Sequence, residues 1–242
     1  MHTKILSAFP GLAVIVLTIT GCIIVVNGKS AQGSGNIITE EREVSAFNKI
    51  HLKGSGKVFL TPGEKQTLVI KTDDNIMPLI ETTVSGDKLT ISHGKHHLRP
   101  TVFEVYITLE KLEGVRISGS GDIIGTGRFV TDTFYAEISG SGDVDLEVET
   151  GKLASKISGS GAIRLAGKAE GYTVSISGSG EINTFDVEAK NVTVKISGSG
   201  DCRVHAVESL DTKISGSGDV YYKGRPRINT KISGSGSLIS RE

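Results

Sequence analysis

The sequence has no tryptophan, only two cysteines and no excess charge of either sign. Its 27 lysines and arginines are balanced by 27 aspartates and glutamates, so the formal net charge is zero. A neutral chain has no overall field to attract a polyanion, and we therefore expect no nucleic-acid partner. The two cysteines, Cys22 and Cys202, give no disulfide framework, so packing must stabilise the fold.

The first residues have the form of an export signal. Lys4 is followed by an apolar run over residues 12–17 and then by Ile-Thr-Gly before Cys22. These last four residues resemble the bacterial lipobox, which implies lipid attachment to the cysteine and cleavage just before it. We predict a lipoprotein signal peptide over residues 1–21, a lipid-anchored tether over residues 22–35, and Cys22 as the lipidation site.

An uncleaved membrane span over residues 5–26 is the alternative. The apolar run continues through Ile23 to Val26 and so reaches the roughly 20 residues that a bilayer requires. If the host is Gram-negative, Ile23 favours the outer membrane, because it is not the aspartate that retains lipoproteins at the inner membrane. We therefore expect an outer-membrane lipoprotein of the bacterial cell envelope, facing either the periplasm or the surface.

The pentapeptide Ile-Ser-Gly-Ser-Gly occurs seven times, at intervals of 18 to 21 residues. Self-similarity at a fixed period of this length is typical of solenoids, and two glycines in every repeat exclude helices as the main element. We predict an all-β parallel solenoid in which each rung contains three short strands. The isoleucines that begin the seven repeats are Ile117, Ile138, Ile157, Ile176, Ile196, Ile214 and Ile232.

Alignment of the repeats at these isoleucines gives three further apolar columns. They lie two and four residues before the isoleucine, and two residues after the second glycine, with polar residues between them. This alternation is typical of strands with one buried and one solvated face. Cys202 stands in the third column among isoleucine, valine and leucine, so we interpret it as a small buried hydrophobic residue and not as a reactive thiol.

The Ser-Gly-Ser-Gly segment is predicted to be the corner of each rung. A sharp bend favours backbone angles that glycine adopts at least cost, and stacked corners leave no room for larger side chains. Serines of successive corners, such as Ser118 and Ser139, would then lie about 4.8 Å apart. We expect their hydroxyls to bond in ladders along the corner.

The chain before the regular repeats shows longer and less regular alternation. Gly54, Ser55 and Gly56 form a diverged copy of the corner, which suggests that this part begins the same solenoid and caps its amino-terminal end. We predict one β-helix domain over residues 36–242, with irregular coils over 36–115 and regular rungs over 116–240.

The order of segments resembles a known family. Residues 40–47, Lys-Gly-Ser-Gly at 53–56, Asp-Asp-Asn-Ile-Met-Pro at 73–78, Leu-Thr-Ile at 89–91 and the Ser-Gly-Ser-Gly array together resemble the bacterial putative auto-transporter adhesin head GIN domain family. The resemblance covers residues 36–240. It implies a single-stranded right-handed parallel β-helix on an exported, often lipid-anchored protein, in a family whose adhesin name rests on analogy.

An acidic column follows the corners and is the main candidate for a metal site. Oxygen ligands repeated on successive rungs bind Ca²⁺ in some β-rolls, but two rungs lack the carboxylate, and aspartate beside a turn often caps local amides. A histidine cluster offers a second candidate, for a transition metal, and a solvated loop is its plainer interpretation. The acidic column is Asp122, Asp143, Ala162, Glu181, Asp201, Asp219 and Ser237, and the histidines are His93, His96 and His97.

An enzyme that acts on polysaccharide is the rival class, because such enzymes also use β-helices. They need converging carboxylates and aromatic platforms, whereas tryptophan is absent here and adjacent aromatic residues, such as Tyr221 and Tyr222, are few. The serines between glycines lack the Gly-x-Ser-x-Gly spacing of a nucleophile elbow. We therefore predict no enzyme, no catalytic residue, no cofactor and no metal.

The sequence thus predicts a non-enzymatic, envelope-anchored scaffold or adhesin-like binding protein. Its expected partners are the membrane, through the lipid anchor, and an unidentified protein or polysaccharide of the envelope. The last rung ends at residues 238–242 without a capping helix, so its open edge is predicted to pair with a second copy, giving a homo-oligomer.

Overall fold

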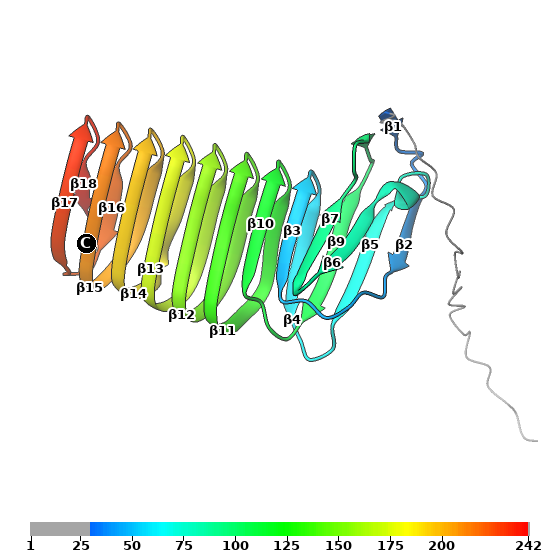
Figure 1. The fold of residues 1–242 in the computed structure, drawn as a ribbon, viewed down its shortest axis with the longest axis horizontal. Helices are drawn as coiled ribbons and strands as arrows, with labels where there is room; N and C mark the ends of the chain where they lie inside the picture. The colour runs from blue at the N-terminus through cyan, green and yellow to red at the C-terminus, as the bar shows by residue number, and fades with distance from the viewer. Residues whose placement is uncertain (1–29, 242) are drawn as a thin grey trace, which may run out of the picture.

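The computed structural model describes residues 30–241 and shows a β-solenoid with a less regular amino-terminal section (Figure 1). The signal peptide, the alternative span and Cys22 lie outside these residues and stay predictions. Within the described part of the chain, no helix has the length and apolar character needed to cross a bilayer.

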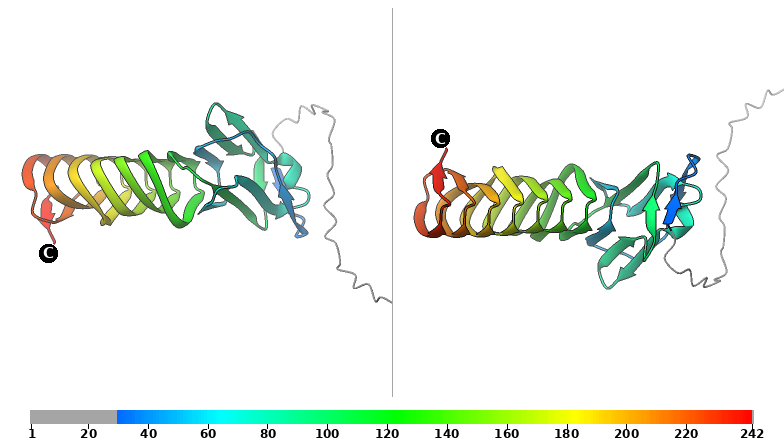
Figure 2. Two further views of the ribbon diagram at one scale, coloured as in Figure 1. Left: turned by 90° about the horizontal axis from the view of Figure 1, so that it is seen from below. Right: turned by 90° about the horizontal axis from the view of Figure 1, so that it is seen from above.

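Successive rungs stack in parallel with their corners in register. Ile117 lies opposite Ile138, and Ile138 lies opposite Ile157, and the same pairing continues to Ile232. Figure 2 shows the rungs following one another along a single axis. The predicted solenoid is confirmed. Its strands are β10 (Gly114–Gly119), β11 (Asp122–Gly140), β12 (Asp143–Gly159), β13 (Ala162–Gly178), β14 (Glu181–Gly198), β15 (Asp201–Gly216), β16 (Val220–Lys223), β17 (Arg227–Gly234) and β18 (Leu238–Ser240).

Each complete rung is one long strand and not three short ones. Strands β11 to β15 each run for 16–19 residues and are interrupted only at the Ser-Gly corner. Neighbouring rungs remain hydrogen-bonded around the other bends, where register shifts such as that between Thr184 and Glu188 absorb the differences in rung length. The prediction of three separate strands is therefore wrong, although the three apolar columns point into one core.

The first glycine of each corner has a positive φ, and Gly140 shows why no other residue fits. Its φ is 138°, and a Cβ atom on it would lie 2.1 Å from the carbonyl oxygen of Gly119 in the preceding rung. The backbone amide of Ser141 donates a hydrogen bond to that same oxygen, at 2.9 Å. The corner therefore requires glycine both for its backbone angle and for the close stacking of backbones.

Backbone groups, not serine hydroxyls, connect the corners. Ser160 and Ser179 repeat the amide-to-glycine-carbonyl bond on later rungs. Within residues 30–241 no hydrogen bond joins the hydroxyls of two corner serines, and the Ser118 hydroxyl instead pairs with His51 Nε2 at 2.9 Å. The expected hydroxyl ladders are therefore absent from the described corners, because each stacked carbonyl already accepts a backbone amide and the serine side chains beyond the first corner face solvent.

The amino-terminal section joins the array through parallel strands and then changes to antiparallel pairing. Gly54 lies directly under Gly119, so the diverged copy is a true corner of the stack. Beyond it, β2, β5 and β9 pair in antiparallel fashion, as do β6 and β7. The elements of this section are β1 (Ser30–Gln32), β2 (Ile37–Glu41), β3 (Lys49–Gly54), β4 (Lys57–Pro62), β5 (Thr67–Asp73), the 3-10 helix η1 (Met77–Leu79), β6 (Glu81–Ser85), β7 (Lys88–Ser92), β8 (His97–Arg99) and β9 (Phe103–Leu109).

The core runs the length of the solenoid and is open at its carboxyl-terminal end. Ile138 and Ile157 are fully buried, and so is Cys202, whose burial raises the pKa of its thiol. Cys202 is thus a packed hydrophobic residue, as its column indicates. In the last rung, by contrast, Ile228 is 44% exposed and Ile232 is 39% exposed, because no described rung covers β17.

Candidate binding surface

The strand segments before the corners form one outward surface, which we call the pre-corner face. On each rung it comprises the residues five, three and one positions before the corner isoleucine and the serine one position after it, because alternate side chains of a strand point outward. The part on the last three rungs is Asn191, Thr193, Lys195 and Ser197 on β14, then Ser209, Asp211, Lys213 and Ser215 on β15, then Arg227, Asn229, Lys231 and Ser233 on β17.

A hollow of about 480 Å³ lies on the pre-corner face across β11 to β14. It exists because small residues, Ala154 and Gly171, stand on the middle rungs where their neighbours carry longer side chains. Tyr135 forms one wall, and its ring lies over Gly114, where a Cβ atom would be 2.1 Å from the ring. Thr193 lines the hollow at its other end, so the hollow adjoins the polar residues of β14.

A column of mostly basic residues runs along the pre-corner face, immediately before the corner isoleucines. In its amino-terminal half, the Glu137 carboxylate lies 3.6 Å from Arg116 and 3.2 Å from Lys156 and compensates their charges. In its carboxyl-terminal half, three exposed lysines follow one another on adjacent rungs in direct register. We call these three residues, Lys195, Lys213 and Lys231, the lysine ladder.

Three carboxylates of the acidic column after the corners accept hydrogen bonds from backbone amides. Asp143 accepts a hydrogen bond from the amide of Ala162, and Asp201 accepts one from the amide of Asp219 at 2.9 Å. Asp219 in turn accepts one from the amide of Ser237 at 2.8 Å. Each of these three carboxylates thus caps an amide one rung further on, whereas Glu181 of the same column pairs with Arg203. This geometry supports the structural interpretation of the column over the calcium site.

The histidine cluster does not form a ligand set in the part of the chain that the structure describes. His93 and His96 are joined only by a backbone hydrogen bond across their turn, at 3.1 Å, while His97 belongs to β8. No group of three histidine, cysteine, aspartate or glutamate side chains in residues 30–241 is placed to hold a metal ion.

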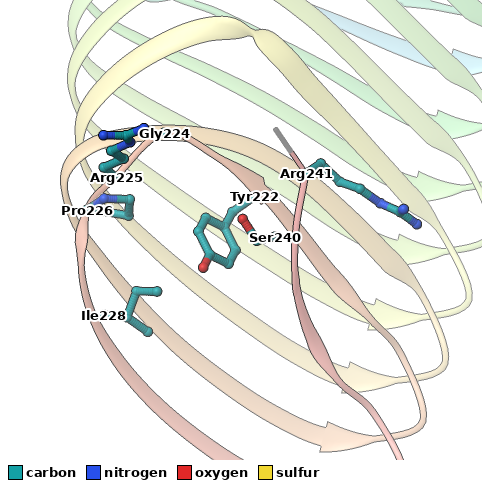
Figure 3. A pocket seen from close by; sticks show the side chains of 7 residues that line it. All are labelled: Tyr222, Gly224, Arg225, Pro226, Ile228, Ser240 and Arg241. Atoms are coloured by element: carbon teal, nitrogen blue, oxygen red, sulfur yellow. The ribbon is translucent and has the colours of Figure 1, made fainter.

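A second hollow, of about 470 Å³, lies at the open carboxyl-terminal end. Figure 3 shows Tyr222 and Ser240 near its centre, Ile228 and Pro226 on one side, and Arg241 directed away from them. Its walls are therefore partly apolar and partly basic.

His51 is a residue of the basic column that the sequence analysis did not single out. It lies opposite Arg116 and is 9% exposed. Burial, together with the positive charges of Arg116 and Lys53, lowers its pKa from 6.5 to about 4, so its imidazole is neutral at neutral pH. His51 belongs to the column because Gly54 lies opposite Gly119 in the stack. The sequence could have placed His51 there only if residues 54–56 were aligned with the regular corners.

The fold and its outward surfaces define an all-β solenoid with long, repetitive faces. The chain belongs to the family described as "Putative auto-transporter adhesin, head GIN domain", whose model matches residues 46–226. No curated protein matches the chain.

Similar solved structures include proteins from Bacteroides and Parabacteroides species. A "putative adhesin" from Bacteroides fragilis is 30% identical, with 87% of this chain and 100% of that chain covered and a TM-score of 0.82. A "putative lipid binding protein" from Parabacteroides distasonis is 28% identical, with 88% and 100% covered and a TM-score of 0.75. A "putative adhesin" from Parabacteroides merdae is 27% identical, with 88% and 99% covered and a TM-score of 0.71. These names describe adhesins and a binding protein, not enzymes.

Proposed function

We propose that this chain is a non-enzymatic, lipid-anchored binding protein of the bacterial envelope, in which a rigid β-solenoid presents its long faces to a partner. The observation that carries the proposal is the arrangement of the chain along the rod. The described chain enters at the end that carries β1 and β2, and the regular rungs extend away from that end to β17 (Figure 2). An anchor before residue 30 would therefore leave the faces and the far end accessible.

The entry point is fixed to the solenoid by a polar clamp. The buried carboxylate of Asp73 accepts hydrogen bonds from the amides of Gly35 and Thr101, at 2.8 and 2.7 Å. Asp74 accepts one from the Ser34 hydroxyl at 2.5 Å and one from the Asn36 side chain at 2.8 Å. These bonds hold residues 34–36 against the end of β5, so a tether that precedes them would pull on the folded end of the rod.

Within this proposal, lipidation at Cys22 determines that the protein is attached to a membrane. The lipobox-like sequence supports lipidation, and Ile23 supports sorting to the outer membrane if the host is Gram-negative. Wild-type protein expressed in a Gram-negative host should take up labelled fatty acid, whereas Cys22→Ala should take up no label. A Cys22→Ala variant that is labelled like the wild type would remove lipidation at Cys22 from the proposal.

Binding through a face is tested with the exported full chain. We expect it to retain material from an envelope fraction and to release no product from a panel of polysaccharides. Release of product would identify an enzyme and overturn the proposal. We further propose that the open edge of β17, with its exposed Ile228 and Ile232, pairs with a second copy of the chain.

A further inference from the structure

We infer that the carboxyl-terminal half of the pre-corner face binds an acidic polysaccharide whose carboxylates lie along the lysine ladder. This inference rests on the proposed role as a binding protein and names the chemical class of its partner. It assigns a ligand to three lysines that make no side-chain hydrogen bond or ion pair with residues 30–241.

The lysine ladder is an arrangement that the folded chain alone does not favour. Lys195 lies opposite Lys213, and Lys213 lies opposite Lys231, on strands about 4.8 Å apart. Like charges on directly opposed residues of a sheet are destabilising. Within residues 30–241 none of the three takes part in an ion pair, whereas Lys156 on the same column is paired with Glu137. An anionic partner would supply the missing countercharge.

The positive charge is local, although the whole chain is neutral. On β14, β15 and β17 the pre-corner face carries the lysine ladder and Arg227, against one carboxylate, Asp211. Asp211 accepts a hydrogen bond from the Asn229 side chain at 2.8 Å. Acidic residues gather instead on the segments after the corners, as in Asp145 and Glu149 of β12. A net charge of zero therefore conceals a basic stripe with carboxylates on a different side of the rung.

The groups beside the ladder favour a sugar polymer over a nucleic acid. Each lysine has a serine two residues after it in the strand, and Thr193 and Asn229 flank the ladder on its other side. Hydroxyl and amide groups can donate to and accept from sugar hydroxyls. The pre-corner face of β14, β15 and β17 carries no aromatic side chain on which a base could stack, and such stacking is a main part of single-strand recognition. A linear acidic glycan along the rod axis meets one lysine per rung.

The test uses polygalacturonate as the probe and the full chain, solubilised in an uncharged detergent. We expect binding by the parent protein that weakens as salt is added, and no binding to neutral dextran. The triple variant Lys195→Gln, Lys213→Gln, Lys231→Gln should bind about tenfold more weakly or worse, because three exposed ion pairs are lost. The matched control, Lys65→Gln, Lys95→Gln, Lys168→Gln, makes the same change in charge away from the ladder and should bind like the parent.

Each other outcome contradicts the inference. Equal affinity of the parent and the ladder variant for polygalacturonate would place the site elsewhere, and a control variant that weakens equally would show binding by net charge alone. Tighter binding of single-stranded DNA or of anionic vesicles than of polygalacturonate, lost in the ladder variant, would assign the ladder to another class of partner. Absence of polygalacturonate binding, with retention of an envelope fraction intact, would reject the acidic glycan and leave the proposed function standing.

Discussion

Tyr172 donates a hydrogen bond to the hydroxyl of Ser155 on the preceding rung, at 3.0 Å, inside the core. Both side chains are buried, with 3% and 2% of their surface exposed. Each is a polar residue in a column of mainly apolar residues, and each hydroxyl gives the other a hydrogen-bond partner. Burial also raises the pKa of the tyrosine, so it remains a neutral donor throughout the ordinary pH range.

This pair predicts a non-additive mutant cycle. Tyr172→Phe should lower the free energy of unfolding by about 1–3 kcal/mol, because the Ser155 hydroxyl is left without its partner in the core. Ser155→Ala should cost a similar amount. The double variant removes both polar groups and should be less destabilised than the sum of the two single changes. Denaturant unfolding of the four proteins measures the cycle, and strict additivity would show that the bond contributes nothing.

The corner geometry predicts which glycines tolerate alanine. Gly140→Ala should strongly destabilise the solenoid, because the new Cβ atom would overlap the carbonyl oxygen of Gly119 and the φ of 138° is strained for alanine. Gly171→Ala, on β13 two rungs further on, is the matched control. Nothing lies within 4 Å of its Cβ position, so its melting temperature should equal or slightly exceed that of the wild type. Equal melting temperatures for the two variants would contradict the stacked corner.

His51 predicts a pH dependence of stability in a narrow window. Its pKa is about 4 in the folded chain and 6.5 ordinarily, so between these values the unfolded chain binds more protons and falling pH favours unfolding. About 2 kcal/mol should be lost from pH 6.5 to pH 4. Carboxylates such as Asp74, whose hydrogen bonds to Ser34 and Asn36 lower its pKa below 3.8, lose their contribution only at lower pH.

The control for this dependence is His51→Gln, which has no titrating group. Its free energy of unfolding should change less than that of the wild type between pH 6.5 and 4.5, measured by urea denaturation at several pH values. The wild type should be the more stable protein at pH 7 if the bond from His51 to Ser118 contributes. Identical pH profiles for the two proteins would show that His51 does not account for the dependence.

The sequence was sufficient to predict the stack but not the contacts across it. The recurrence of Ile-Ser-Gly-Ser-Gly and the period-two alternation determine which side chains face the core, and these predicted the burial of Ile138, Ile157 and Cys202. Continuous strands depend on hydrogen bonds between rungs, which no single repeat contains. The antiparallel pairing of β2 with β5 joins segments about 30 residues apart that share no repeat.

The candidate surface could not be identified from the sequence for a different reason. The lysines of the ladder are visible as a column once the repeats are aligned, yet the same column suits any solvated face. The net charge of the whole chain is zero, so it gives no indication of the local basic stripe. Only the register of β14, β15 and β17, together with the position of Glu137 on an earlier rung, shows which lysines lack a countercharge among the described residues.

The lysine ladder also predicts a stability effect in the absence of any partner. Replacing Lys213, the middle residue, by glutamine removes two repulsive neighbour contacts and should raise the melting temperature slightly at low salt. The increase should shrink when salt screens the charges. Lys156→Gln is the control, because it breaks a pair with Glu137 and should not stabilise. Differential scanning calorimetry of the wild type and both variants at low and high salt measures the effect. If the Lys213 variant melts at the same temperature as the wild type in both salts, the lysines of the ladder do not repel one another measurably.

Pairing of two copies through β17 predicts self-association that salt promotes. A two-fold, antiparallel contact would cover Ile228 and Ile232 of both copies, but it would also bring Arg227 and Lys231 of the two copies together. Screening of these charges should therefore shift the equilibrium toward dimer, in contrast to an interface held by ion pairs. Sedimentation velocity at low and high salt measures the shift, and Ile232→Lys should keep the chain monomeric by placing a further charge in the contact. A wild type that stays monomeric at high concentration in both salts would rule out the pairing and leave the end of the solenoid free for a different partner.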